Sequence, residues 1–163
     1  MAVDMFLYLD GVTGESIKKG HEKWIEIFSF SNGVSNASGV SLGTGSGTGK
    51  ADFSSLSVQR SMDTATPGLF LACCNGTHYK TGKLHAQESG GKSVVLFFDC
   101  ELTECFIDSI SWGGAAGGGK PSESLSFSFK TISITCNGQD DQGNLIAGPN
   151  TGWDVGGNTS LGG

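Results

Sequence analysis

Apolar and polar residues alternate with a period of two along most of the 163-residue chain, the pattern of half-buried β-strands. The pattern predicts a mainly β fold whose strands are joined by many turns. The expected strands span residues 4–10, 22–31, 50–60, 83–89, 93–102, 104–111 and 124–136, with a short last strand at 151–155.

Two of these segments depart from simple alternation. In 22–31 aromatic residues occupy one alternating set and Ile25 and Ile27 the other, so we expect this strand to be covered on both faces. In 124–136 the apolar phase shifts by one residue near Lys130, and such a shift turns every later side chain to the opposite face. We therefore predict a β-bulge or sharp bend at Lys130, of the kind that lets one strand serve two sheets or close a barrel.

One segment, 64–76, has the signals of a helix. Thr66 can cap it, Pro67 suits its first turn, and Gly76 suits the left-handed position after its last turn. Apolar residues at helical spacing are expected to face the core. These residues are Leu69, Phe70 and Cys73.

A glycine-rich stretch, 32–49, separates the second and third expected strands. It is long for a connection inside a compact domain, and it has too few apolar residues to fold by itself. These properties fit an extended arm that becomes ordered against a partner.

The end of this stretch has some features of a phosphate-binding loop, but the match fails. Gly49 and Lys50 supply the end of a Walker A pattern, whereas Thr44 stands where its first glycine should be and Ala51 where its hydroxyl should be. The dinucleotide fingerprint is also absent, and a strand rather than a helix follows. We therefore expect no nucleotide site here.

Composition narrows the class of protein further. Charged residues make up only 16% of the chain, glycines number 27, and the net charge is −6. An acidic chain without clustered Lys and Arg is not expected to bind nucleic acid or anionic membranes. The chain has no long apolar run and no basic region near its start, so we expect neither membrane insertion nor a cleaved signal peptide. We expect one domain, 1–156, followed by a flexible tail, 157–163.

Residues able to carry chemistry do not form a recognisable constellation. The five cysteines include the adjacent pair Cys73 and Cys74, which argues against a disulfide framework and for buried structural thiols made in a reducing compartment. Cys74 and His78 could act as nucleophile and base, but nothing marks the orienting third group. Asp140 and Asp141 lack the order of a calcium loop and are expected in a turn. We expect no catalytic residue, no metal and no cofactor.

Several motifs occur in a fixed order along the chain. They are MAVDMFLYLDGVTGES, HEKWIEI, the glycine-rich stretch ending in Gly-Lys, DTATPGLFLACCNGTHY, LTECFIDSISWGG, ESLSFSFKTISITC and TGWDV. Together they resemble the haemolysin-coregulated protein (Hcp) family of bacterial type VI secretion over about residues 1–156. The adjacent cysteines and the Gly/Ser-rich tail depart from the family pattern.

The resemblance implies a β-barrel of two antiparallel sheets with one short helix and a long glycine-rich loop. It also implies a non-enzymatic subunit that forms homohexameric rings, which stack into the inner tube of a contractile injection machine. The expected partners are other copies of the chain, effector proteins in the lumen, and the spike, baseplate and sheath. The family is made in the bacterial cytoplasm and exported into other cells without a cleaved signal.

The same resemblance makes the glycine-rich stretch an assembly arm, because glycine permits unusual backbone conformations and a closed ring needs head-to-tail contacts. A transport lumen should be polar without being adhesive, and Ser29 and Ser31 are candidates for it, the alternative being ordinary exposed strand serines. The arm residues are Gly43, Thr44, Gly45, Ser46, Gly47, Thr48, Gly49 and Lys50.

A second function class stays open at this point. A monomeric β-sandwich that binds carbohydrate would also be acidic and rich in strands. Such modules expose aromatic residues on loops, whereas the aromatic residues here mostly occupy alternating strand positions.

Overall fold

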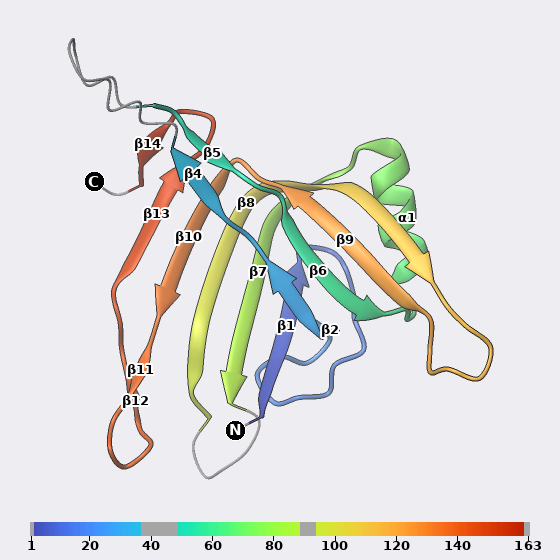
Figure 1. Ribbon diagram of the computed structural model, residues 1–163, viewed down its shortest axis with the longest axis horizontal. Coiled ribbons are helices and arrows are strands. Elements are labelled where there is room, and N and C mark those ends of the chain that lie inside the picture. The colour runs from blue at the N-terminus through green and yellow to red at the C-terminus, as the bar shows by residue number, and fades with distance from the viewer. Residues whose placement is uncertain (1, 37–48, 89–93, 162–163) are drawn as a thin grey trace.

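The computed structural model describes residues 2–36, 49–88 and 94–161 (Figure 1). Within them the chain forms antiparallel strands and one helix, which confirms the predicted fold class. The elements are β1 Val3–Leu9, β2 Ile25–Ile27, β3 Ser29–Ser31, β4 Val34–Asn36, β5 Ala51–Phe53, β6 Leu56–Ser61, α1 Thr66–Asn75, β7 His78–Glu88, β8 Leu96–Gly113, β9 Ser122–Ser128, β10 Thr131–Cys136, β11 Gly138–Gln139, β12 Leu145–Ile146, β13 Asn150–Asp154 and β14 Thr159–Ser160.

The long strand β8 is the centre of the main sheet. It pairs with β7 along one edge. In addition, its first part pairs with β10 and its second part pairs with β9. Expecting two separate strands at 93–102 and 104–111 was therefore wrong. The polar pair Thr103–Glu104 marks a local distortion, with Glu104 at a φ of 48°, and the strand continues through it.

The bend predicted at Lys130 is confirmed. Phe129 and Lys130 separate β9 from β10, and the Lys130 amide donates to the Thr103 carbonyl at 2.9 Å. The segment 124–136 thus folds as two strands that both pair with β8, and it turns where its apolar phase shifts.

The expected strand 22–31 is divided at Phe28 into β2 and β3. Ile25 and Ile27 are buried, whereas Ser29 and Ser31, which a continuous strand would place on the same face, are exposed. The chain changes the face it turns to the core at Phe28, whose side chain is 63% exposed. The prediction of one strand covered on both sides was therefore wrong.

Because of this division, the hydrogen-bonded ladder of the barrel stays open between β2 and β3. The hydrogen-bonded ladder runs from β2 through β1, β7, β8, β9 and β6 to β3. Its two ends are joined by the chain itself at Phe28, and no ladder between β2 and β3 closes the barrel in the described part of the chain. Figure 1 shows the strongly twisted sheet that results.

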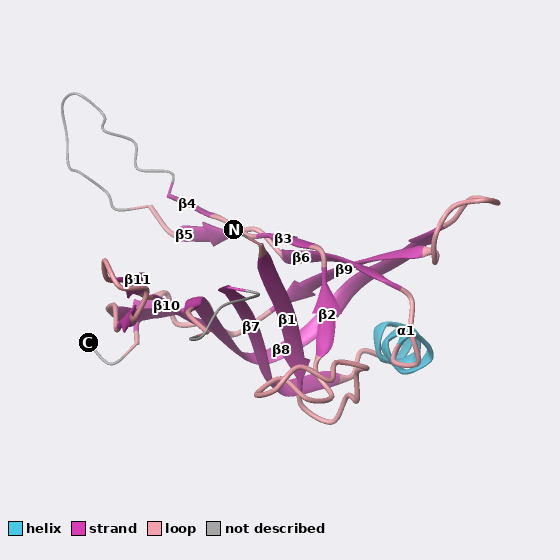
Figure 2. Ribbon diagram, turned by 90° about the horizontal axis from the view of Figure 1, so that it is seen from below, coloured by secondary structure: helices cyan, strands magenta, loops and turns pink. Residues whose placement is uncertain are grey.

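The helix packs on the second half of β8, at the end of the sheet opposite β4 and β5 (Figure 2). Gly76 ends it at a φ of 69°, as predicted. Thr66 is its first residue rather than its cap, a position that Ala65 takes, and the Thr66 hydroxyl accepts from Arg60 and from the Asp63 amide. Leu69 and Ala72 face the core, whereas Phe70 is exposed, which corrects the expected core face.

The remaining boundaries differ from expectation in detail. The expected strand 50–60 is interrupted between β5 and β6, where the Ser54 amide donates to the Gly33 carbonyl at 2.9 Å. The short last strand is confirmed as β13. Residues 159–160, which the sequence placed in a flexible tail, pair with β13 as β14.

Candidate functional site

A face lined by hydroxyl groups crosses four neighbouring strands, β3, β6, β9 and β8. The registers place its residues in two rows that run across the sheet. We call this surface the serine face. One row is Ser31, Ser57, Ser126 and Ser109, and the other is Ser29, Gln59, Ser124 and Ser111.

The serine face follows from strict alternation in these strands. Between the serines, apolar side chains point into the core, and Val58 and Leu125 are buried there. On the serine face itself, Ser124 donates to the Gln59 side chain at 2.7 Å, and the hydroxyls of Ser57 and Ser126 lie 3.3 Å apart. The two rows carry no formal charge, and both predicted lumen residues lie in them.

The carboxylate of Asp108 borders the serine face. Asp108 lies at the β-bulge of β8, where the register against β9 shifts. Its oxygens accept hydrogen bonds from Ser55 at 2.8 Å and from Ser128 at 2.6 Å. Hydroxyl donors from β9 and from the β5–β6 connection therefore hold this charge at the edge of the surface.

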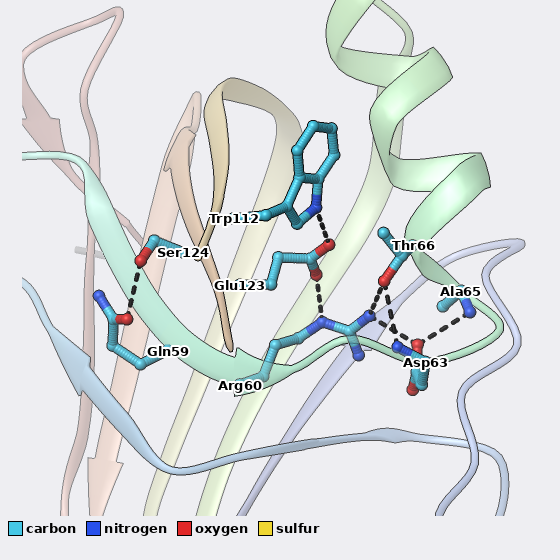
Figure 3. A network of polar contacts seen from close by, with 8 residues as sticks. All are labelled: Gln59, Arg60, Asp63, Ala65, Thr66, Trp112, Glu123 and Ser124. Atoms are coloured by element: carbon cyan, nitrogen blue, oxygen red, sulfur yellow. Dashed lines mark hydrogen bonds and ion pairs between the residues drawn. The ribbon is translucent and has the colours of Figure 1, made fainter. Parts of the chain in front are cut away.

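A buried ion network supports the sheet behind the serine face (Figure 3). Arg60 pairs with Glu123 through its Nε and with Asp63 through an NH₂ group at 2.6 Å. The same NH₂ group donates to the Thr66 hydroxyl at 3.0 Å, and Trp112 donates to Glu123 at 2.8 Å. The network thereby ties β6, β9, β8 and the start of α1 together.

The electrostatics of this network favour the charged forms of its members. Burial opposes charge on Arg60, but hydrogen bonds and charges from Asp63 and Glu123 outweigh it, so the pKa of Arg60 is raised. Burial likewise opposes charge on Asp63, and the Arg60 guanidinium outweighs it and lowers the pKa of Asp63. A carboxylate held this way stays ionised below its ordinary range.

Sequence reasoning missed this network, although the strand patterns carry a signal for it. Arg60 falls in phase with the apolar positions Leu56 and Val58, and Glu123 falls in phase with Leu125 and Phe127. Two opposite charges in the apolar phases of two strands indicate a buried ion pair, since unpaired charges are rarely buried.

Strands β4 and β5, which flank the predicted arm, form a separate two-stranded ribbon (Figure 2). Asn36 at the end of β4 donates to the Gly49 carbonyl at 2.9 Å, and Lys50 beside it is exposed. Of the predicted arm residues, 43–48 lie outside the described part of the chain. Gly49 and Lys50 lie at the base of the arm.

A groove of about 860 Å³ separates the base of the arm from β10 and β13. Phe30 and Phe98 stack within it, with ring centres 5.5 Å apart. Val34 and Ile134 remain exposed along its walls, and Nε1 of Trp153 is buried with no hydrogen-bond partner in the described residues. The single chain therefore leaves apolar surface uncovered directly beneath β4 and β5.

Comparison with known proteins decides the family. The family model described as "Type VI secretion system effector, Hcp" matches residues 6–136. The chain is 33% identical to protein hcp1 of Pseudomonas aeruginosa over 156 residues, which cover 95% of this chain and 96% of the relative. The chain belongs to the Hcp family.

Solved structures agree with this assignment. A structure described as a type six secretion system protein superposes with a TM-score of 0.88 at 32% identity, covering 98% of this chain and 99% of the other. Hcp1 from Salmonella typhimurium superposes with a TM-score of 0.78 at 26% identity, covering 99% of this chain and all of the other. This Hcp chain is thus a structural protein of type VI secretion.

The remaining candidate residues of this Hcp chain are dispersed. Cys100 and Cys105 are buried, and burial raises the pKa of their thiols to about 12 and about 11. Cys74 and Cys136 are exposed, which corrects the expectation that all the cysteines are buried. Asp140 accepts the amides of the turn that follows it, as predicted.

Among residues 2–36, 49–88 and 94–161, no cluster of three or more His, Cys, Asp or Glu side chains is arranged to hold a metal ion. The helix described in this Hcp chain is too short to span a bilayer.

Proposed function

We propose that this chain is the ring-forming subunit of a type VI inner tube, with the serine face lining the lumen and the arm joining one subunit to the next. The proposed assembly is a hexameric ring that stacks into a tube, is exported with it, and carries effector proteins inside. Spike, baseplate and sheath proteins would be its other partners.

The observation that carries the lumen proposal is the chemistry of the serine face. A surface past which protein cargo moves must stay hydrated and must not hold the cargo by apolar contact or by a fixed charge. Two uncharged rows across four strands meet both conditions. Short hydroxyl side chains also leave room, because they extend little from the sheet.

The arm proposal rests on the groove beneath β4–β5. An apolar surface of this kind is commonly covered by another chain, and a head-to-tail ring presents a different surface of the neighbour to each subunit. The base of the arm and the groove are adjacent, so one neighbour could contact both.

Native mass spectrometry at several concentrations, followed by negative-stain imaging of the same sample, tests the proposal. We expect a closed species of six subunits and ring-shaped particles. Deleting residues 41–48 should leave a folded subunit that forms neither rings nor stacks. A monomer at every concentration would contradict the ring proposal. Normal stacking by the deletion variant would contradict the arm proposal. A monomer that gives hits on a glycan array would favour carbohydrate binding instead.

A further inference from the structure

Two histidines far apart in sequence meet on the outer surface of the barrel. Nε2 of His21, in the loop 10–24 that joins β1 to β2, lies 2.8 Å from Nδ1 of His85 on β7. Nε2 of His85 lies 3.1 Å from Oδ1 of Asp99 on β8. The three side chains therefore form one continuous chain of hydrogen bonds from the sheet to the loop.

Aromatic side chains enclose the His21 end of this chain. Its ring stacks on Phe6 of β1 with centres 4.4 Å apart, and Trp24 meets its ring edge-on at 4.7 Å. His21 is buried as a result, and Nδ1 of His21 has no hydrogen-bond partner among the described residues. His85 lies between Trp24 and the carboxylate.

The positions of the hydrogens follow from these contacts. Ionised Asp99 accepts from Nε2 of His85, which leaves a lone pair on Nδ1 of the neutral ring. That lone pair accepts from Nε2 of His21, so Nδ1 of His21 is the nitrogen without a hydrogen. Both histidine contacts are thus satisfied with both imidazoles neutral.

Added protons disrupt this arrangement in two steps. The first proton, on either ring, places a hydrogen on Nδ1 of His21, where no acceptor lies. The second proton gives hydrogens to both nitrogens of the His21–His85 contact, so two donors face each other and the bond is lost. A buried donor without a partner and two adjacent cations both disfavour the closed loop.

Burial outweighs the favourable neighbouring charges at both histidines. Burial is the main cause that lowers the pKa of both histidines, and each neighbouring charge has a smaller effect. The positive charge of His85 opposes protonation of His21, and Glu22 favours it. Lys83 opposes protonation of His85, whereas Asp99 and Glu101 favour it. The titratable and charged side chains on this face are Asp4 and Tyr8 of β1, Lys18 and Glu22 of the loop, Glu26 of β2, Lys83 of β7, and Asp99 and Glu101 of β8.

We propose that the His21–His85–Asp99 chain is a proton-operated latch, which holds loop 10–24 on the barrel when both histidines are neutral and releases it when both are charged. The latch rests on contacts within one chain, so it does not depend on the proposed ring. Its release would change the surface that the subunit presents in acidic surroundings.

Other contacts also act on the loop: an ion pair between Lys18 and Asp4 of β1 at 3.3 Å and hydrogen bonds within the loop hold it, and one strained residue opposes closure. The loop is closed by the Gly14 amide donating to the Lys23 carbonyl at 2.7 Å and by the Ser16 amide donating to the Trp24 carbonyl at 3.0 Å. Lys23 adopts a φ of 68°, a conformation that opposes closure in a residue other than glycine. Ile17 is 92% exposed on the loop, so it adds little apolar burial to hold it.

Hydrogen exchange of the loop amides as a function of pH measures the latch in the full chain. After division by the intrinsic exchange rate, the rate reports the equilibrium constant for opening, which changes about tenfold per pH unit for each proton gained on opening. Below pH 6.5, the ordinary histidine value, and above about pH 5, we expect the equilibrium constant for opening to rise by more than tenfold per pH unit over part of the window as pH falls, because both imidazoles gain protons on opening.

Three variants make the test specific. In His21→Gln the side-chain amide can donate to His85, or accept from it once His85 is protonated. Because this amide cannot be charged, the equilibrium constant for opening should rise by less than tenfold per pH unit. His78→Gln removes the exposed histidine stacked on Phe106 and should behave as wild type. Gly14→Ala should open the loop at every pH, because its Cβ would lie 2.3 Å from the Trp24 carbonyl oxygen.

Two results would overturn the latch. One is an exchange profile of His21→Gln as steep as that of wild type, and the other is a wild-type rise below tenfold per pH unit throughout the window. Size-exclusion chromatography of the same samples reports ring formation separately, so failure of the latch and failure of the ring proposal can be distinguished.

Discussion

The guanidinium of Arg60 on β6 pairs with the carboxylate of Glu123 on β9, and their side chains are 1% and 0% exposed. The two residues are direct cross-strand partners, one position from the pair Gln59 and Ser124 on the serine face. A slip by one residue would expose the ion pair and bury the serines. The pair therefore opposes any alternative register of the proposed lumen wall.

Removing one member of this pair should destabilise the subunit strongly. In Arg60→Met the carboxylates of Glu123 and Asp63 lose their buried cation, and breaking a buried pair in this way costs about 3–5 kcal/mol. Denaturant unfolding monitored by tryptophan fluorescence measures this loss. In Arg60→Met/Glu123→Leu much of it should be recovered, because Glu123 no longer leaves a charge uncompensated. A double variant less stable than Arg60→Met would contradict this account.

Asp63 should make the stability of the subunit depend on acid pH. Its pKa is lowered in the folded state below the ordinary value of 3.8, so the unfolded chain binds the proton more readily. The stabilisation is complete above the unfolded value and is lost as pH falls through the folded one. Asp63→Asn should cost about 1.5–3 kcal/mol near neutrality, the typical value of a hydrogen bond to a charged group. Urea unfolding at a series of pH values should show that the difference in the free energy of unfolding between Asp63→Asn and wild type shrinks below about pH 4. A difference that does not depend on pH would refute a stabilising role for the ionised Asp63 carboxylate.

The sequence predicted local features better than relations between segments. The bend at Lys130 and the end of the helix at Gly76 were found, because a phase shift and a left-handed glycine leave local marks. The division at Phe28 was missed, since both halves of 22–31 alternate and only tertiary contacts decide which face each half turns to the core.

The candidate sites show the same limit. Ser29 and Ser31 were selected from one strand, but the serine face exists only through register with β6, β9 and β8. The contact of His21 with His85 spans 64 residues and has no local signal. The family, by contrast, was recognisable from motif order alone, because that order extends over nearly the whole chain.

Gly82 in β7 is a position where a side chain would be crowded by the core. A Cβ there would lie 3.0 Å from the Cys105 sulfur and 3.4 Å from a methyl group of Leu9. Gly82→Ala should therefore lower the free energy of unfolding by about 1–3 kcal/mol, the usual cost of overpacking a core. Gly113→Ala is a matched control in β8, since its Cβ would meet only the Ser122 hydroxyl at 4.0 Å. Equal melting temperatures for the two variants would show that the barrel accommodates the methyl group.

Ser31 offers the most direct test of the proposed lumen. It is exposed in β3 at the end of the row that continues through Ser57, so a larger side chain there projects from the serine face without disturbing the core behind it. Ser31→Gln should leave ring formation unchanged in native mass spectrometry and should reduce co-purification of an effector protein. Ser133→Gln, on β10 outside the two rows, is the control and should retain cargo. Normal cargo binding by Ser31→Gln in intact rings would remove Ser31 from the lumen, whereas loss of the rings themselves would place it in a subunit interface.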